Sequence, residues 1–198
     1  RRRRESAAPS GETGMSTLIV VAIIVVVGLY AVTLYNRLVR QRNLAREGWS
    51  GIDVQLKRRA DLIPNLVETV KGYAAHEKGI FDEVAEKRAA SMRASDVTSQ
   101  AAADQALSGA LGRLTAISEA YPELKADANF RQLQTELATI EDEMQKARRY
   151  YNATVRDLNT SIQSFPAVLV AQSLGFCEEP FYEIEDRAAA SVPPKVAF

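Results

Sequence analysis

The sequence predicts an all-α protein, in which a single N-terminal transmembrane helix is followed by an elongated antiparallel bundle of three or four helices. Three observations support this fold class. An uncharged apolar run covers residues 15–35. Apolar residues then recur at steps of three and four, a spacing that places them on one side of a helix. No useful length of chain alternates with a period of two, so we expect no strands.

The length of 198 residues allows one membrane anchor and one domain of ordinary size. Apolar residues make up 46% and charged residues 25%, which is typical of a globular protein. We expect a non-native or disordered extension at 1–14, a transmembrane helix at 15–36, a cytoplasmic helical-bundle domain at 37–187 and a flexible tail at 188–198. Because the chain opens with RRRR and Met15 directly precedes the apolar run, we interpret Met15 as the true start.

The apolar run is interpreted as a membrane anchor. Its 21 residues would span about 31 Å as a helix, and a bilayer hydrocarbon core is about 30 Å thick. Signal peptides have shorter apolar cores followed by small residues at a cleavage site, and neither feature is present. Four arginines crowd its C-terminal flank: Arg37, Arg40, Arg42 and Arg46. Arginine near the end of a span favours the cytoplasmic side, which predicts a single-pass protein of the inner (plasma) membrane with its N-terminus outside. A translated RRRR opening would favour the opposite orientation.

A ladder of apolar residues follows the anchor and runs through Pro64 without losing register. Its members are Trp49, Ile52, Leu56, Ile63, Leu66, Val70, Tyr73, Ile80 and Val84, with Arg59 and Glu77 in core slots. We therefore expect a continuous helix to about Arg93, kinked at Pro64, in which the Ala60 carbonyl loses its partner. The alternative is a break at this point, with Asp61 as the N-cap and Pro64 in the first turn.

Further helices are predicted in the second half of the chain. Residues 94–105 are small and polar and indicate a loop or the start of the next helix. Residues 106–127 indicate a short helix closed by a proline. The longest apolar stripe runs from 130 to 165 with a charged face that includes Arg148, and Pro166 ends it. A last short helix would end at Gly175.

The residues that usually carry chemistry do not form a catalytic pattern. His76 is the only histidine and Cys177 the only cysteine, so a conventional triad, an internal disulfide and a zinc site of several thiolates are excluded. Asn152 and Asn159 begin glycosylation acceptor sequences, but both fall inside the predicted long helix and are interpreted as chance matches. We expect no enzyme activity, no cofactor, no metal and no nucleic-acid partner. The arginines beside the span would instead contact anionic lipid.

Several long segments together resemble the LemA family. They are YNRLVRQRNLAREGWSGIDVQLKRRADLIPNLVETVKGYAAHEKGIF, ALSGALGRLTAISEAYPELKADANFRQLQTELATIEDEMQKARRYYNATVRDLN and FPAVLVAQSLGF, within roughly residues 16–187. The resemblance implies one N-terminal span and a helical-bundle domain without catalytic residues. One branch of the family is linked to magnetosome membrane formation, and members often accompany membrane-bound heat-shock metalloproteases. Cys177 and the RRRR opening depart from the family pattern.

The sequence thus predicts a membrane-anchored, non-enzymatic scaffold or adaptor of the bacterial inner membrane. Its partners would be further copies of itself or other membrane proteins, including a quality-control metalloprotease. Candidate contact or core residues are Trp49, Tyr73, Tyr150 and Tyr151, and the pairs Gly48/Gly51 and Gly109/Gly112 would permit close helix approach. The alternative function is membrane remodelling or anionic-lipid binding through the basic segment that follows the span.

Overall fold

The computed structural model describes residues 12–183, and all regular elements in that range are helical. The principal helices are α1 (Glu12–Lys71), α2 (Lys78–Arg93), α3 (Val97–Ile117) and α5 (Ala128–Gln163), and the short elements are η1 (Ser118–Ala120), α4 (Pro122–Ala126) and η2 (Ala167–Leu169). This confirms the predicted all-α fold. Residues 12–14 of the expected N-terminal extension belong to α1. The remainder of that extension and the expected tail at 188–198 lie outside the described residues.

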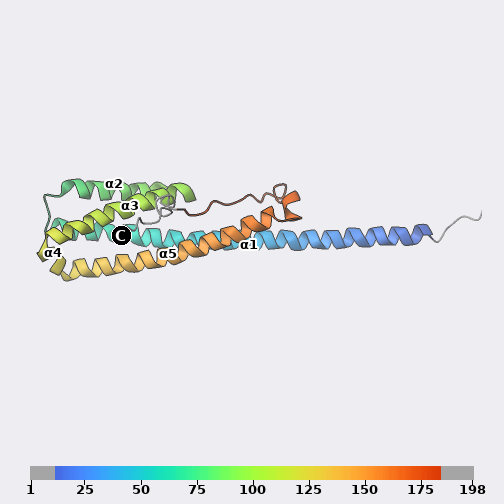
Figure 1. The fold of residues 1–198 in the computed structure, drawn as a ribbon, viewed down its shortest axis with the longest axis horizontal. Helices are drawn as coiled ribbons and strands as arrows, with labels where there is room; N and C mark the ends of the chain where they lie inside the picture. Colours follow the sequence, from blue (N-terminus) through green and yellow to red (C-terminus); the bar gives the residue numbers. More distant parts are fainter. Residues whose placement is uncertain (1–11, 184–198) are drawn as a thin grey trace, which may run out of the picture.

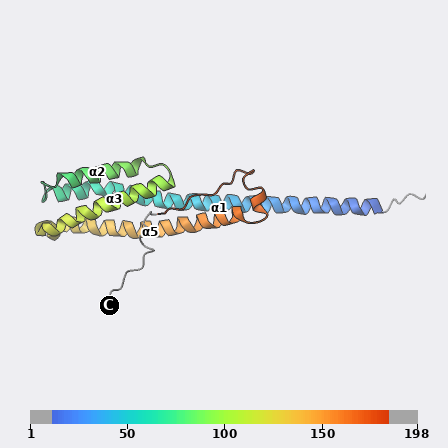
Figure 2. The ribbon, with the colours of Figure 1, turned by 45° about the horizontal axis from the view of Figure 1, so that its top comes forward.

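The long helix α1 forms the axis of the molecule, and the bundle is built around its C-terminal part (Figure 1). Helix α5 runs antiparallel along α1, and the hairpin of α2 and α3 covers the part of α1 farthest from its free end (Figures 1 and 2). The apolar side chains from Met15 to Val32 are exposed and touch no other element of the bundle. Within residues 12–183, α1 is the one helix long and apolar enough to cross a membrane. This indicates a membrane location.

Two apolar cores lie one behind the other along α1. The core nearer the apolar end contains Leu38 and Ile52 of α1, Met144 and Leu158 of α5, and Phe176, which follows η2 in the chain. The far core joins all five α-helices and contains Ile63, Val70, Val84, Leu107, Leu114, Leu124 and Phe130. Arg59 lies on α1 between the two sets and is itself buried.

Helix α1 continues through Pro64, so the alternative of a break with Asp61 as N-cap is wrong. Proline has no N–H, and the Ala60 carbonyl therefore loses its usual helical donor. The Arg88 side chain of α2 replaces that donor, because its Nε atom donates to the Ala60 carbonyl oxygen at 2.7 Å. Tertiary packing thus satisfies the acceptor that the proline leaves open.

The helix ends at Lys71, so the predicted continuation to about Arg93 is wrong. Gly72 follows the last turn, and the chain reverses through residues 72–77 before α2 begins. Ala74 is buried in the far core, which fixes this turn against the bundle. The apolar residues keep their spacing across the turn because α1 and α2 both bury these residues in the far core. Spacing alone does not distinguish one long helix from two helices joined by a turn that keeps the register.

The later helices differ from the prediction mainly in their ends. Helix α3 starts at Val97, where Asp96 caps it by accepting from the Ser99 amide at 2.9 Å. Pro122 begins α4, where its missing N–H costs no hydrogen bond, and does not close the preceding helix. Helix α5 follows the predicted stripe closely. The expected helix after Pro166 is a single 3₁₀ turn followed by further turns that end at Gly175, whose φ is +76°.

Candidate functional site

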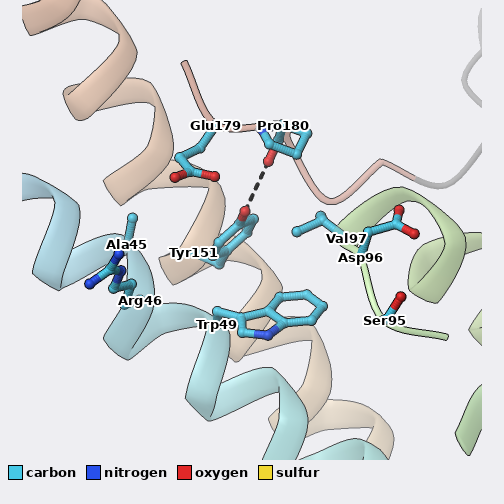
Figure 3. A pocket seen from close by; sticks show the side chains of 9 residues that line it. All are labelled: Ala45, Arg46, Trp49, Ser95, Asp96, Val97, Tyr151, Glu179 and Pro180. Atoms are coloured by element: carbon cyan, nitrogen blue, oxygen red, sulfur yellow. Dashed lines mark hydrogen bonds between the residues drawn. The ribbon is translucent and has the colours of Figure 1, made fainter. Parts of the chain in front are cut away.

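A surface pocket of about 350 Å³ lies where α1, α5, the α2–α3 connection and the C-terminal segment meet (Figure 3). The residues that line it are Ala45, Arg46, Trp49, Ser95, Asp96, Val97, Tyr151, Glu179 and Pro180. Hydrogen bonds from the Ser99 side chain and backbone lower the pKa of Asp96, so this carboxylate is ionised at neutral pH. The pocket therefore combines an aromatic floor with charged groups of both signs at its rim.

Three aromatic rings pack beneath this pocket. The ring centroids of Trp49 and Tyr151 are 5.8 Å apart, and those of Trp49 and Tyr182 are 6.4 Å apart. Gly48 makes this arrangement possible, since a Cβ atom there would lie 3.0 Å from the Tyr151 Cα atom. The predicted close approach is thus present at Gly48. At Gly109 and Gly112 an added Cβ atom would meet no backbone within 4 Å, so that pair brings no two helices together within residues 12–183.

Two asparagines of α5 hold the residues 176–183, which we call the strap, along the bundle. The Asn159 side chain accepts from the Glu179 amide at 2.9 Å and donates to the Glu179 carbonyl at 2.9 Å. Asn152 pairs in the same two-way manner with Tyr182, at 2.8 and 3.1 Å. We call these two asparagine pairings the clamp. The seven residues from Asn152 to Asn159 rise about 10 Å along the helix, and the three from Glu179 to Tyr182 span about the same distance when extended, so both pairings can form at once.

The strap is also held by Tyr151, whose hydroxyl donates to the Pro180 carbonyl at 2.9 Å (Figure 3). Burial, and secondly the charge of Glu179, raise the pKa of Tyr151 to about 12. Sequence reasoning missed the clamp, because it interpreted Asn152 and Asn159 as chance glycosylation matches. Their seven-residue spacing on one helix face was the available signal.

A buried ionic network lies between the two cores. Asp104 of α3 is 1% exposed and accepts from Arg59 Nη1 at 2.8 Å, from Arg148 Nη2 and from the Tyr182 hydroxyl at 3.0 Å. Glu141 lies 3.5 Å from Arg59 and 3.6 Å from Arg148. The charges of the two arginines are therefore balanced by those of the two carboxylates. We call these five residues the Asp104 network. It connects α1, α3, α5 and the strap through one carboxylate.

The sequence indicated only part of this network. Arg59 was placed in a core slot, and it is buried there. Arg148 was assigned to the charged outer face, which is wrong, since its side chain is 12% exposed and its guanidinium also lies 5.2 Å from the centroid of the Tyr182 ring. Asp104 was missed. Burial, followed by the nearby Asp104 charge, raises the pKa of Tyr182, which keeps its hydroxyl available as a donor.

The four predicted aromatic residues do not form one surface. Trp49 and Tyr151 belong to the pocket, and Tyr150 is exposed beside them on α5. Tyr73 lies in the turn after α1, on the far core's side of the molecule, where its hydroxyl donates to Asp127 at 3.1 Å. The hydrogen bond to Asp127 raises the pKa of Tyr73.

The four predicted lipid-contacting arginines lie on α1 just after its apolar part. Arg37, Arg40 and Arg46 are exposed. Arg42 is partly buried, and its guanidinium lies 4.8 Å from the centroid of the Phe176 ring.

Among residues 12–183, no group of three or more metal-ligating side chains could hold a metal ion. His76 is exposed in the turn between α1 and α2, and Cys177 is exposed at the start of the strap.

Comparison with known proteins identifies the family. The sequence matches the LemA family model over residues 48–198. Magnetosome proteins MamQ 1 and MamQ 2 of Paramagnetospirillum magneticum are each 26% identical over 211 residues, which cover 92% of this chain and 77% of the relative. Protein LemA of Metamycoplasma hominis is 29% identical over 140 residues, or 70% of this chain and 64% of the relative. The family match begins at Gly48 and covers well over half of the chain, and the chain therefore belongs to the LemA family.

Proposed function

We propose that this protein is a membrane-anchored, non-enzymatic scaffold or adaptor that presents its helical bundle to other proteins. The continuity of α1 carries this proposal. One helix includes both the apolar segment and one side of both cores, with no linker between them. A bundle attached in this way has a fixed orientation to the bilayer, which suits a docking platform.

The pocket at Trp49 and Tyr151 is the proposed contact site for a protein partner. Tryptophan and tyrosine are enriched among the residues that dominate binding energy at interfaces. The strap forms one wall of the pocket through Glu179 and Pro180, so a partner would contact α1, α5 and the strap together. The partner is a second copy of the chain or another membrane protein, and a membrane-bound quality-control metalloprotease is one candidate.

Photo-crosslinking of the full chain in native membranes tests this site. A photoreactive amino acid at Ser95, an exposed residue of the pocket rim, should give discrete protein adducts. The same group at Thr115, an exposed residue of α3 outside the pocket, is the matched control. A photoreactive amino acid at Arg46, which also lines the pocket, should give the same adducts, and Ser95→Arg, which fills the pocket from its rim, should abolish them.

The identity of the adduct distinguishes self-association from binding of another protein. An adduct of two copies, together with sedimentation of the detergent-solubilised protein as an oligomer, would support self-association. Equal labelling at Ser95 and Thr115, or a monomer that captures no protein, would overturn the scaffold proposal.

The proposed location is the inner (plasma) membrane, with the N-terminus outside and the bundle in the cytoplasm. Exposed Arg37, Arg40 and Arg46 beside the span support this orientation. Cys177 is the sole cysteine and is exposed, so it reports topology directly. A membrane-impermeant thiol reagent should label it only after the cells are permeabilised, and labelling in intact cells would reverse the orientation.

Anionic-lipid binding is a second candidate function, favoured by those same exposed arginines. Each basic residue at an anionic surface contributes about 1 kcal/mol, and salt screens this attraction. In nanodiscs with and without phosphatidylglycerol, Arg37→Gln, Arg40→Gln and Arg46→Gln together should abolish enrichment of the anionic lipid around the protein. Enrichment that is unaffected by these changes or by salt would contradict this role.

A further inference from the structure

The loop between α5 and the strap, residues 164–175, is unusually apolar for a surface segment. It contains no charged residue. Phe165 is 79% exposed and Leu169 is 69% exposed, and Val168, Val170 and Leu174 are also exposed. Its inward residues, Ala167 and Ala171, are buried against the bundle. The loop is therefore apolar on both its inner and its outer side.

The rest of the bundle has no comparable cluster of exposed apolar side chains within residues 12–183. The other exposed large apolar side chains after the apolar part of α1, such as Val54 and Met92, are far apart in the sequence. Isolated exposed apolar residues are normal on protein surfaces, whereas contiguous patches mark contact sites.

The loop is fixed at the point on α1 where the apolar segment ends. Phe176, directly after the loop, stacks edge-on against Tyr35 with 5.7 Å between ring centroids. Leu38 is fully buried in the same core as Ala171 and Phe176. Figures 1 and 2 show the loop beside α1 at the end of the bundle next to its free apolar part.

Helix geometry gives the height of this contact. If residues 15–35 fill the hydrocarbon core, Leu38 lies about 4 Å beyond its boundary and Arg42 about 10 Å beyond it, at 1.5 Å per residue. The head-group layer on each side of the core is about 5–8 Å thick. Phe176, which directly follows the loop, contacts Tyr35 at this boundary and Arg42 about 10 Å beyond it, so the end of the loop lies at the level of the head groups.

We infer that residues 164–175 insert into the interfacial layer of the bilayer that α1 spans, as a second and non-covalent membrane contact of this protein. The inference rests on the proposed spanning role of α1. The occupant of the exposed face is lipid, because the face begins where the lipid-embedded surface of α1 ends and is continuous with it. Tyrosines such as Tyr35 suit this layer, in which one side is apolar and the other is wet. Phenylalanine and leucine, such as Phe165 and Leu169, are typical of the apolar face of segments that lie in it.

The contact is hydrophobic and not electrostatic. The loop carries no charge, so its insertion should be independent of salt and of anionic lipid, unlike binding through Arg37, Arg40 and Arg46. This difference separates the inference from the lipid-binding role considered above.

Depth-dependent fluorescence quenching in nanodiscs tests the inference on the full chain. In a Cys177→Ser background, single cysteines would replace Leu169 in the loop, Ile24 in the middle of the apolar segment and Thr115 on α3. Each would carry the same environment-sensitive fluorophore in phosphatidylcholine discs. Nitroxide lipids would be labelled either near the head group or near the end of the acyl chain.

We expect the Leu169 label to be quenched most by the head-group nitroxide, the Ile24 label by the acyl-chain nitroxide and the Thr115 label by neither. Quenching at Leu169 should be the same at low and high salt. Adding Phe165→Ser and Leu174→Ser should reduce quenching at Leu169 and leave that at Ile24 unchanged. Both side chains are exposed, and an unchanged far-ultraviolet spectrum would verify the fold.

Quenching at Ile24 without quenching at Leu169 would overturn the inference and leave the span intact. Absence of quenching at Ile24 would instead overturn the spanning role on which it rests. If the Leu169 label is unquenched while unlabelled Leu169→Cys protein forms disulfide-linked dimers, a second copy covers the loop in place of lipid, and the inference is wrong.

Discussion

At the scale of single residues, the most consequential side chain is Asp104. Arg59 and Arg148 are largely buried, and this carboxylate is their shared acceptor. Removing one partner of a buried ionic group leaves uncompensated charge, which costs far more than the loss of a surface ion pair. The network also joins the strap to the helices through Tyr182. The network therefore connects four segments of the chain: α1, α3, α5 and the strap.

Asp104→Ala is therefore expected to lower the free energy of unfolding by about 3–5 kcal/mol. The measurement is thermal unfolding of the detergent-solubilised protein, followed by the near-ultraviolet circular dichroism of the Trp49 cluster. Asp142→Ala on the exposed face of α5 is the matched control and should change stability little. Equal stability of the two variants would show that the network does not hold the bundle together.

Because Tyr151 and Tyr182 have raised pKa values, we expect the free energy of unfolding to fall at alkaline pH. The pKa of both hydroxyls is raised, for Tyr151 to about 12 from an ordinary value of 10, chiefly by burial. A raised pKa means that the folded state holds the proton more tightly, so the stabilisation is complete below pH 10 and is lost as the pH rises through the folded pKa.

Between pH 10 and 12, the stability of the unsubstituted protein should therefore fall by at most about 1.4 kcal/mol per pH unit for each tyrosine. The double variant Tyr151→Phe, Tyr182→Phe should show a shallower slope in the same unfolding assay. Tyr150→Phe, which changes an exposed neighbour, is the control. A double variant with the same slope as the unsubstituted protein would contradict this explanation.

At the scale of elements, α1 continues through Pro64, and another helix supplies the donor that the proline lacks. The Ala60 carbonyl accepts from Arg88 of α2, a charged donor in a partly buried position. Hydrogen bonds that involve a charged group contribute about 1.5–3 kcal/mol. The proline thus couples the local structure of α1 to the docking of α2.

A double-substitution cycle tests this coupling. Arg88→Met should destabilise the protein by about 1.5–3 kcal/mol, since the Ala60 carbonyl then has no partner. In a Pro64→Ala background, the new backbone N–H supplies the donor, and Arg88→Met should have little effect. Additive effects in chemical denaturation would show that Arg88 does not compensate for the proline.

At the scale of the whole molecule, the continuity of α1 predicts that the protein stands upright on the membrane as a rod, given the proposed span. From Leu38 to Lys71 the helix rises about 50 Å, so the turn at residues 72–77 should lie at about that height above the bilayer. A donor fluorophore at Ala75→Cys, in a Cys177→Ser background, should transfer little energy to acceptor-labelled lipid.

Insertion of four glycines after Asn36 should raise this energy transfer. Glycine is unfavourable in a helix by about 1 kcal/mol per residue, and the insertion would therefore loosen the connection between the span and the bundle. High transfer in the protein without the insertion would show that the bundle lies along the membrane, contrary to the expected upright rod.

The sequence by itself determined the fold class, the candidate span and most of α5. Each depends on a pattern that is local: an uncharged run of fixed length for the span, and a stripe of apolar residues every three or four positions for the helix. The passage of α1 through Pro64 was also predicted, because the ladder keeps its register there. The resemblance to the LemA family was also visible in the sequence, because several long segments match the family pattern in the same order along the chain.

Only the tertiary structure decided where the chain reverses, which polar groups are buried and what the asparagines do. Local spacing is the same for one helix and for two helices in register, so the turn after Lys71 was missed. The partners in the Asp104 network are 45 residues apart for Arg59 and 44 for Arg148, and the clamp of Asn152 on Tyr182 spans 30. Such contacts arise from packing of distant segments, and no periodicity in a single sequence records which side chains will meet.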